Sequence, residues 1–342
     1  MKSPRIPKTL MEFQDLASRN LSNNIDSDYD EDEYPQLKVQ LIESNLPKIP
    51  PQIDEFSAWK KMEDSRHWYI SSQSDGKHVM LNKISDRVWA AYTLMSIDDF
   101  SRTINKWIRK TTKLDNCWIS TKQMEWIGKE MKWKERGIGI TFKDTLSSAP
   151  DISKVSLKAW YGNNRLISDM LGKMKDVFST NSIRWKSDTT AKTSSEWYSN
   201  GKITFHASED MNEIIHCVSE MAGRYNESLN HATKLRDEEM GSFEFSFKQK
   251  IPLEEYSAAA GKGRGNLKLW MTEIESHDDF KRLQGVDLHT WDRVFLDLGN
   301  DYAYMTIPGN GCVNAVPRLV SVQGETALGK TEITYNGNEI FV

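Results

Sequence analysis

The sequence predicts an α+β protein with a ferredoxin-like (βαββαβ) middle unit, flanked by an α/β N-terminal unit and a β-rich C-terminal unit. From about residue 57 onward, short apolar runs alternate with stretches whose apolar residues recur at helical spacing. The longest such stretch, residues 210–236, carries a continuous apolar stripe. After residue 250 the apolar runs are short and are separated by hairpin-type turns such as Asn336-Gly337.

Composition sets the class of protein. The 342 residues suffice for about two domains, and 38% hydrophobic with 27% charged residues is ordinary for a globular chain. No apolar run approaches the ~20 residues that span a bilayer, so we expect no membrane contact. Cys117, Cys217 and Cys312 lie too far apart for a disulfide framework or a CxxC zinc motif, which favours a cytoplasmic location.

Residues 1–56 differ from the rest of the chain. They hold six of the ten prolines and an acidic run at residues 26–33, so we expect a disordered, acidic, Pro-rich arm. Leu10, Phe13, Leu16 and Ala17 are at helical spacing. A short amphipathic helix there would grip a partner or the body of the protein, or would fray in water.

The second segment, residues 57–150, is predicted to be an α/β unit with basic and aromatic helices. Ser96 and Ser120 are each followed by an apolar stripe, which predicts a capped helix after each. The strands are expected at 66–70, 77–82, 88–94, 117–119 and 137–142.

The third segment, residues 151–250, gives the order that defines a ferredoxin-like unit. Strands are expected at 155–160, 182–185, 202–206 and 243–247, with helices at 166–177 and 210–236. The fourth segment, 251–342, is expected to be a β-rich unit packed on the third. Its strands are predicted at 267–271, 294–298, 302–307, 319–322 and 332–335, and its helices near 252–260 and 277–284.

A basic, aromatic segment at 102–136 is the first candidate site. It carries ten Lys or Arg against four Asp or Glu, although the whole chain has a net charge of −4. A basic stripe with neighbouring tryptophans can follow a phosphate backbone and stack on bases. The alternatives are a solvated helix face, or a patch covered by the acidic run at 26–33. The candidate polyanion-binding residues are Arg102, Lys106, Arg109, Lys110, Lys113, Trp126, Lys129 and Lys132.

A His and carboxylate cluster at 273–301 is the second candidate site. Convergent imidazoles and carboxylates bind divalent metals, and a metal-dependent hydrolase or nuclease would use them. The candidate ligands are His277, Asp287, His289 and Asp292. Their spacing matches no metal motif, and several of the acids suit helix caps or turns.

Two weaker candidates complete the set. Lys262 and Arg264, in the Gly-rich stretch 261–265, would form a phosphate-binding loop or a flexible connector. Cys312 with His289 is the one nucleophile pairing that the residue types allow, and nothing in the sequence brings the two together.

No catalytic signature such as GxSxG, HExxH or a kinase motif occurs in the sequence. The sequence therefore favours a non-enzymatic, cytoplasmic interaction or regulatory protein that acts within a complex. We expect a protein partner, with nucleic acid as a further partner at the basic, aromatic face. No cofactor is expected, except a divalent metal under the alternative of a hydrolase or nuclease.

Overall fold

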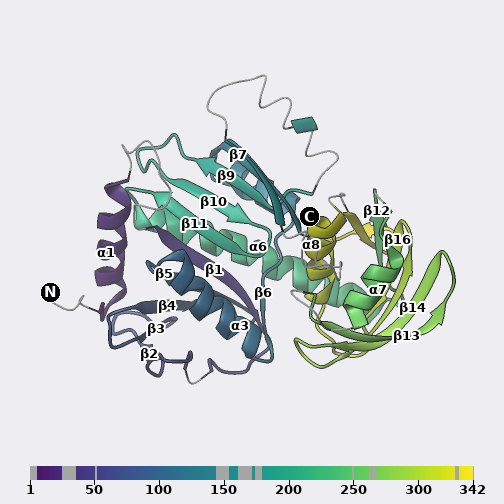
Figure 1. The fold of residues 1–342 in the computed structure, drawn as a ribbon. Helices are drawn as coiled ribbons and strands as arrows, with labels where there is room; N and C mark the ends of the chain where they lie inside the picture. Colours follow the sequence, from purple (N-terminus) through teal and green to yellow (C-terminus); the bar gives the residue numbers. More distant parts are fainter. Residues whose placement is uncertain are drawn as a thin grey trace. The chain divides into compact units, whose positions relative to one another are not determined.

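The structure is a computed structural model of the chain (Figure 1). It describes residues 6–24, 36–50, 52–143, 154–160, 172–173, 179–248, 250–261, 263, 267–327 and 331–341. These residues form a mixed α/β protein with two antiparallel sheets.

The chain divides into two units. The first consists of Met1–Cys117, Glu125–Glu135 and Arg184–Asn226, and the second of Trp118–Met124, Arg136–Ile183 and Glu227–Val342. The boundaries between these units do not coincide with those of the predicted segments. Helix α6 (Met211–Glu238), for example, contributes residues to both units.

The first unit is built on a sheet with β1 (Leu37–Ser44) near its centre. All eight residues of β1 are buried, and the strand pairs antiparallel with β5 (Val88–Thr93) on one side and β11 (Lys202–Ala207) on the other. Beyond β5 come β4 (His78–Lys83), β3 (Trp68–Ser72) and β2 (Lys60–Lys61). Beyond β11 come β10 (Ser194–Tyr198) and β9 (Ser182–Lys186), while β6 (Leu114–Asn116) pairs with the end of β1.

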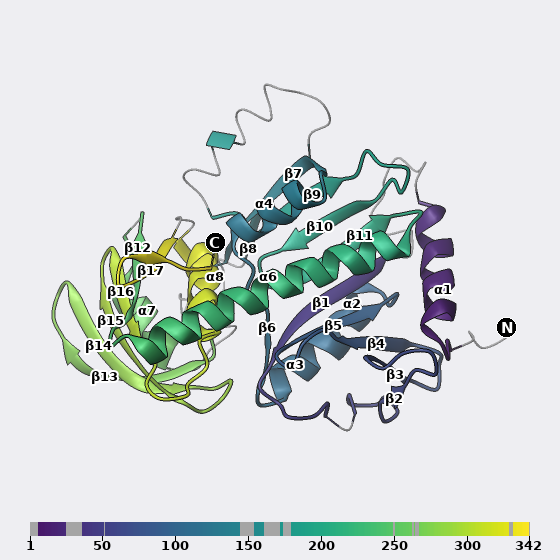
Figure 2. The ribbon, with the colours of Figure 1, turned by 180° about the vertical axis from the view of Figure 1, so that it is seen from behind.

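Helices cover both faces of this sheet. Figures 1 and 2 show α6 along one face, and a helical segment made of α2 (Ile97–Phe100), η1 (Ser101–Asn105) and α3 (Lys106–Lys110) along the other. Ser96 caps α2 by accepting a hydrogen bond from the backbone N–H of Asp99, at 3.1 Å, as the sequence predicts. The apolar face of the segment, which includes Phe100, Ile104 and Trp107, packs on Ile42 and Trp89 of the sheet.

The prediction of a disordered arm at 1–56 is wrong for the part of it that the structure describes. Helix α1 (Leu10–Ser22) buries Phe13, and the Phe13 ring packs edge-on against Tyr92 at 6.5 Å. Strand β1 lies in the middle of the sheet. The acidic run at 26–33 lies outside the described residues. Prolines and acidic residues dominate the composition of residues 1–56, so composition alone does not indicate helix α1 or the fully buried strand β1.

The second unit contains a seven-stranded sheet in the order β13-β14-β15-β16-β12-β17-β18. These strands are β13 (Leu269–Ser276), β14 (Phe280–Asp287), β15 (Arg293–Gly299), β16 (Tyr302–Thr306), β12 (Phe243–Phe247), β17 (Thr331–Tyr335) and β18 (Asn338–Glu339). Each neighbouring pair is antiparallel. The unit also holds β8 (Lys154–Trp160) and all but the first two residues of its hairpin partner β7 (Lys134–Lys143), with α7 (Leu253–Gly261) and α8 (Ala315–Ala327). Helix α4 (Thr121–Glu130) is divided between the units.

The ferredoxin-like arrangement is not found among the described strands. β12, the expected last strand of that unit, pairs with β16 and β17, and β8, the expected first strand, pairs with β7. Residues 166–171 and 174–177, within the first expected helix, lie outside the described residues. The order of helices and strands was therefore a poor guide here, because it does not fix which strands share a sheet.

Two elements of the C-terminal segment have a different type from the one predicted. Residues 319–322, expected as a strand, lie in α8, where Pro317 occupies the first helical turn. Residues 277–284, expected as a helix, fall on the β13–β14 turn and β14, since Asp278 and Asp279 belong to the turn rather than to a helix cap. In the part of the chain that the structure describes, no helix combines the length and the apolar character needed to cross a membrane.

Candidate functional site

A groove of about 600 Å³ in the first unit is the candidate site. Its volume falls in the range of about 300–1,000 Å³ that bound small molecules occupy. Ile53 and Trp107 line it and also belong to the hydrophobic core, so part of its wall is apolar and fixed. The remaining lining residues are Asp54, Glu55, Gln73, Asp75, Lys77, Asp99, Ser101, Arg102, Thr103, Lys106 and Arg109.

Exposed ion pairs hold several of the charges in the groove. Lys77 Nζ lies 3.2 Å from a carboxylate oxygen of Asp99 and 3.3 Å from one of Asp75. Asp54 lies 3.1 Å from Lys110 Nζ and 3.6 Å from Lys106 Nζ. Hydrogen bonding from Lys110 lowers the pKa of Asp54, and hydrogen bonding to Asp99 and Asp75 raises the pKa of Lys77. These lysines are therefore already partnered within the protein.

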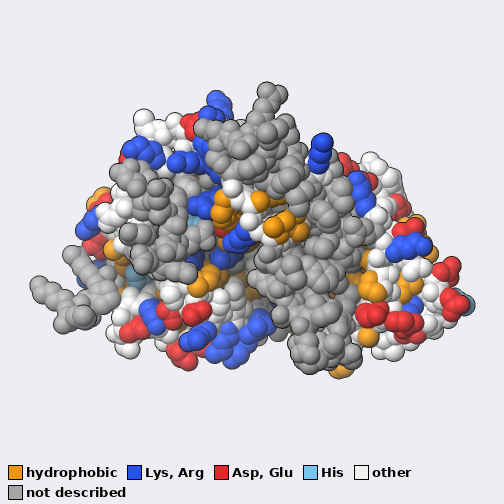
Figure 3. Space-filling model, turned by 45° about the horizontal axis from the view of Figure 1, so that its top comes forward, with side chains coloured by type: hydrophobic (Ala, Val, Ile, Leu, Met, Phe, Trp, Pro, Cys, Tyr) orange, Lys and Arg blue, Asp and Glu red, His pale blue; other side chains and the backbone are white. Residues whose placement is uncertain are grey.

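Arg102 and Arg109 differ from the lysines. Both are exposed, both line the groove, and neither forms an ion pair or a side-chain hydrogen bond with any residue in the described ranges. Positions 102 and 109 are seven residues apart on the helical segment that η1 and α3 form. Figure 3 shows Lys and Arg side chains gathered, with Asp and Glu beside them, near the lower edge of the face, in the region of α3. A guanidinium group can contact a phosphate through two parallel N–H donors.

Two backbone features mark this groove. Ser101–Asn105 is π-helical, and short π-helical turns are rare and concentrate at functional sites. Glu55 has a φ of 67°, in the left-handed region that non-glycine residues seldom occupy. Such strained residues persist where the surrounding structure fixes them, often at binding sites.

The remaining basic and aromatic candidates lie outside the groove. Lys113, with a φ of 70°, forms the turn after α3. The half-buried Trp126 on α4 has its ring 5.5 Å from the guanidinium carbon of Arg224, and Lys129 is exposed on the same helix. Lys132 adopts a φ of 56° where α4 ends, and Trp133 N–H bonds to the carbonyl of Gly128 as in a Schellman motif. The structure thus brings together Arg102, Lys106 and Arg109 of the predicted stripe.

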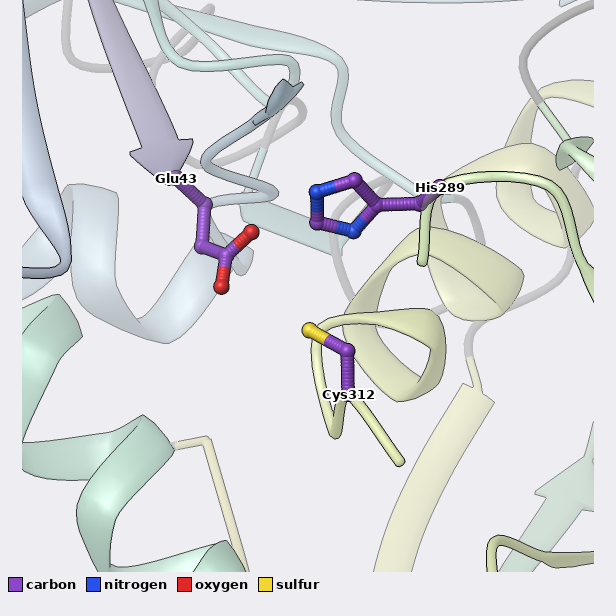
Figure 4. Close-up of side chains that lie close together, drawn as sticks. All are labelled: Glu43, His289 and Cys312. Atoms are coloured by element: carbon purple, nitrogen blue, oxygen red, sulfur yellow. The ribbon is translucent and has the colours of Figure 1, made fainter. Parts of the chain in front are cut away.

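A second cluster of chemically active residues lies inside the second unit. Asp287 ends β14, and its Oδ1 accepts hydrogen bonds from Arg318 Nη2 at 2.5 Å and from the backbone N–H of His289 at 3.0 Å. Asp287 and Arg318 are 1% and 0% exposed. Cys312 precedes α8, and its Sγ lies within 4.8 Å of a ring nitrogen of His289 (Figure 4). Glu43, also drawn in Figure 4, belongs to the first unit and accepts from Arg87 Nε at 2.9 Å.

The predicted metal ligands are divided between the two ends of β14. His277 is exposed in the β13–β14 turn, where its Nε2 lies 3.2 Å from Glu275. Asp287 and His289 are at the opposite end of β14. Asp292 immediately precedes the return strand β15, and its carbonyl accepts from Asp287 N–H at 2.9 Å. Lys262 and Arg264 lie outside the described residues, so their predicted phosphate loop stays a prediction.

The model of one protein family, described as MJECL33-like protein, matches residues 8–327. The chain belongs to this family. No curated protein and no solved structure matches the chain.

The part of this MJECL33-like chain that matches the family model includes both the groove and the buried cluster. Sequence reasoning found Arg102, Lys106 and Arg109 but missed Asp54, Lys77 and Arg318. Arg318 did leave a signal, because it is the one charged residue in the otherwise apolar or uncharged run 311–322. A lone charge in such a run indicates a buried partner.

Proposed function

We propose that this MJECL33-like protein binds nucleic acid through the groove of its first unit, as a cytoplasmic component of a larger complex. The observation that carries the proposal is the pair Arg102 and Arg109, which line one groove and have no partner among the described residues. The first unit contributes binding and no catalysis under this proposal.

The arrangement favours a phosphate-bearing strand over a free carboxylate. Two guanidinium groups that come from positions seven residues apart on one helical segment can contact separate phosphates of one strand. Trp107 is 5% exposed and forms part of the groove wall, with Trp59 packed beside it at 5.8 Å between ring centroids. An aromatic side chain in the wall of the groove gives a base of the same strand an apolar surface to pack against.

The charges of the groove also set a limit on the attraction. Four acids and four bases line it: Asp54, Glu55, Asp75, Asp99, Lys77, Arg102, Lys106 and Arg109. Attraction by bulk positive charge is therefore weak, and two specific contacts carry the binding. For single-stranded nucleic acid we expect a log–log salt slope of roughly −1.4, taking roughly −0.7 for each of two phosphate contacts.

The test is a titration of a fluorescent single-stranded oligonucleotide, followed by anisotropy at several salt concentrations. The double reversal Arg102→Glu with Arg109→Glu should weaken binding about a hundredfold, because each charge-assisted contact contributes about 1.5 kcal/mol and about 1.4 kcal/mol is a factor of ten. Thermal melting should be unchanged, since both side chains are exposed.

The matched control is the double reversal Lys60→Glu with Lys61→Glu. These lysines are exposed on edge strand β2 of the same unit, do not line the groove, and change the net charge by the same amount. An equal loss of affinity in the control, or no binding by the unaltered protein at about 50 mM salt, would rule the proposal out.

A further inference from the structure

The buried cluster of the second unit contains a thiol and an imidazole that reach into the same space (Figure 4). Cys312 is 5% exposed and His289 is 1% exposed, and their Sγ and ring nitrogen lie within 4.8 Å. Nucleophile and base pairs of enzymes act at about 2.6–3.2 Å and are often looser before substrate binds, so this pair has to close by a small side-chain movement. Among the described residues, Cys312 forms no disulfide.

Both partners of this pair are held in place by the surrounding structure. The backbone N–H of His289 is bonded to Asp287, whose carboxylate is in turn bonded to Arg318 on α8. On the other side, the Arg236 guanidinium of α6 donates to the carbonyl of Gly311, the residue before Cys312. A nucleophile and a base that are positioned in this way lose little entropy when they react.

Helix α8 adds an electrostatic contribution. It is 13 residues long and starts at Ala315, and the N–H of Ala315 bonds to the carbonyl of Cys312 at 3.4 Å. The positive end of a helix and a neighbouring imidazole both favour the thiolate over the thiol. The other two cysteines are different, because complete burial raises the pKa of Cys117 and of Cys217 well above the ordinary thiol value.

We propose that Cys312 and His289 form a nucleophile and base pair that hydrolyses a small ester or thioester. His289 takes the thiol proton, and the Cys312 sulfur attacks the carbonyl carbon of the substrate. The C–O or C–S bond of the substrate then breaks, and the leaving group takes the proton from His289. Water, deprotonated by His289, next attacks the acyl–cysteine thioester, which releases a carboxylic acid and restores the thiol.

The burial of the pair limits the substrate to a small or narrow acyl group. The exposed residues Pro308, Gly309 and Asn310 lead directly into the buried Gly311 and Cys312. We therefore propose a small acyl group as the substrate, since a folded protein cannot reach a thiol that is 5% exposed.

The first experiment uses the full-length protein, iodoacetamide and mass spectrometry at about pH 6, where an ordinary thiol of pKa about 8.5 is almost wholly protonated. We expect Cys312 to be alkylated at least about tenfold faster than an ordinary thiol. A larger fraction of Cys312 is thiolate at this pH, and this gain outweighs the lower nucleophilicity of each thiolate. Cys117 and Cys217 should stay unlabelled and serve as internal controls. Labelling of Cys312 only after unfolding would overturn the proposal.

The second experiment replaces His289 by Gln, which keeps a polar side chain of similar size. The rate of Cys312 alkylation at about pH 6 should fall about tenfold in His289→Gln. His277→Gln, which removes an exposed histidine of the same unit, is the matched control and should change nothing. Equal rates in His289→Gln and in the unaltered protein would also overturn the proposal. If His289→Gln fails to fold, the pH dependence of the alkylation rate in the unaltered protein still tests the proposal.

The third experiment measures the reaction itself with p-nitrophenyl acetate as the probe. A burst of one equivalent of p-nitrophenol, together with the mass of one acetyl group on the Cys312 peptide, is the expected result. Cys312→Ser should lose the burst, and a Cys117→Ser with Cys217→Ser double variant should keep it. A burst that survives in Cys312→Ser, or acetylation confined to lysines, would count against this pair.

Discussion

The charge pairs of the two units differ in how far their side chains are exposed to solvent. In the first unit, Asp54 of the groove and its partner Lys110 are 58% and 59% exposed, whereas in the second unit Asp287 and Arg318 are 1% and 0% exposed. An exposed pair is screened by salt and water and contributes little to folding. A buried pair cannot lose one partner without leaving an uncompensated charge in the interior. The groove can therefore exchange its internal partners for a ligand, and the buried pair cannot.

The strongest test of this difference is Arg318→Met in the second unit. We expect the free energy of unfolding to fall by about 3–5 kcal/mol, because the carboxylate of Asp287 loses its buried partner. Denaturant unfolding followed by circular dichroism measures the loss. Lys110→Met, which removes a partner from the exposed Asp54, should leave the midpoint unchanged.

A double variant separates pairing from packing. Asp287→Leu with Arg318→Met removes both charges and should be more stable than Arg318→Met alone, since no unpaired charge remains. If the double variant is as unstable as the single one, the loss comes from the shape of the side chains and the comparison fails.

The sequence was sufficient to predict elements whose apolar pattern is local. Ser96 with Phe100, Ile104 and Trp107 predicts the capped helical segment, and the stripe from Met211 to Leu229 predicts α6. The β1 strand was missed although Leu37, Val39 and Leu41 alternate with Lys38 and Gln40, because prolines and acidic residues dominate the composition of residues 1–56. All eight residues of β1 are nevertheless buried, including Lys38 and Gln40. These polar residues are buried because β5 and β11 pair with β1 on either side. The local sequence does not show which strands will pair.

The candidate sites show the same limit. Helical spacing puts Arg102, Lys106 and Arg109 on one side of a helix, which the structure has. Lys106 differs from the two arginines because it pairs with Asp54, which is far away in the sequence. Cys312 and His289 are likewise brought together by a hairpin and a helix start that share no sequence motif.

A smaller effect is expected from releasing the two lysines that pair with Asp54. Asp54→Asn removes the carboxylate that holds Lys110 and Lys106, so both ammonium groups become available to an anionic ligand. We expect the affinity for the single-stranded oligonucleotide to rise by up to about fivefold, since an exposed ion pair seldom restrains a side chain more strongly. Anisotropy titrations at equal salt measure the change. An unaltered or weaker affinity would mean that these lysines do not face the ligand.

The smallest expected effect is the response of the same groove to pH. Because Lys110 lowers the pKa of Asp54, the ion pair is fully present above the ordinary aspartate pKa of about 4 and is lost as the pH falls through the lowered value. Phosphodiesters keep their charge in this range, so oligonucleotide affinity should rise slightly at the acid end in the unaltered protein. The carboxyl groups of Glu55, Asp75 and Asp99 also line the groove. The part due to Asp54 is therefore the difference between the unaltered protein and Asp54→Asn, measured while circular dichroism still reports folded protein. Parallel pH profiles for the two proteins would show that the Asp54 pair does not compete with the ligand, and the groove would then resemble the buried pair in keeping its own partners.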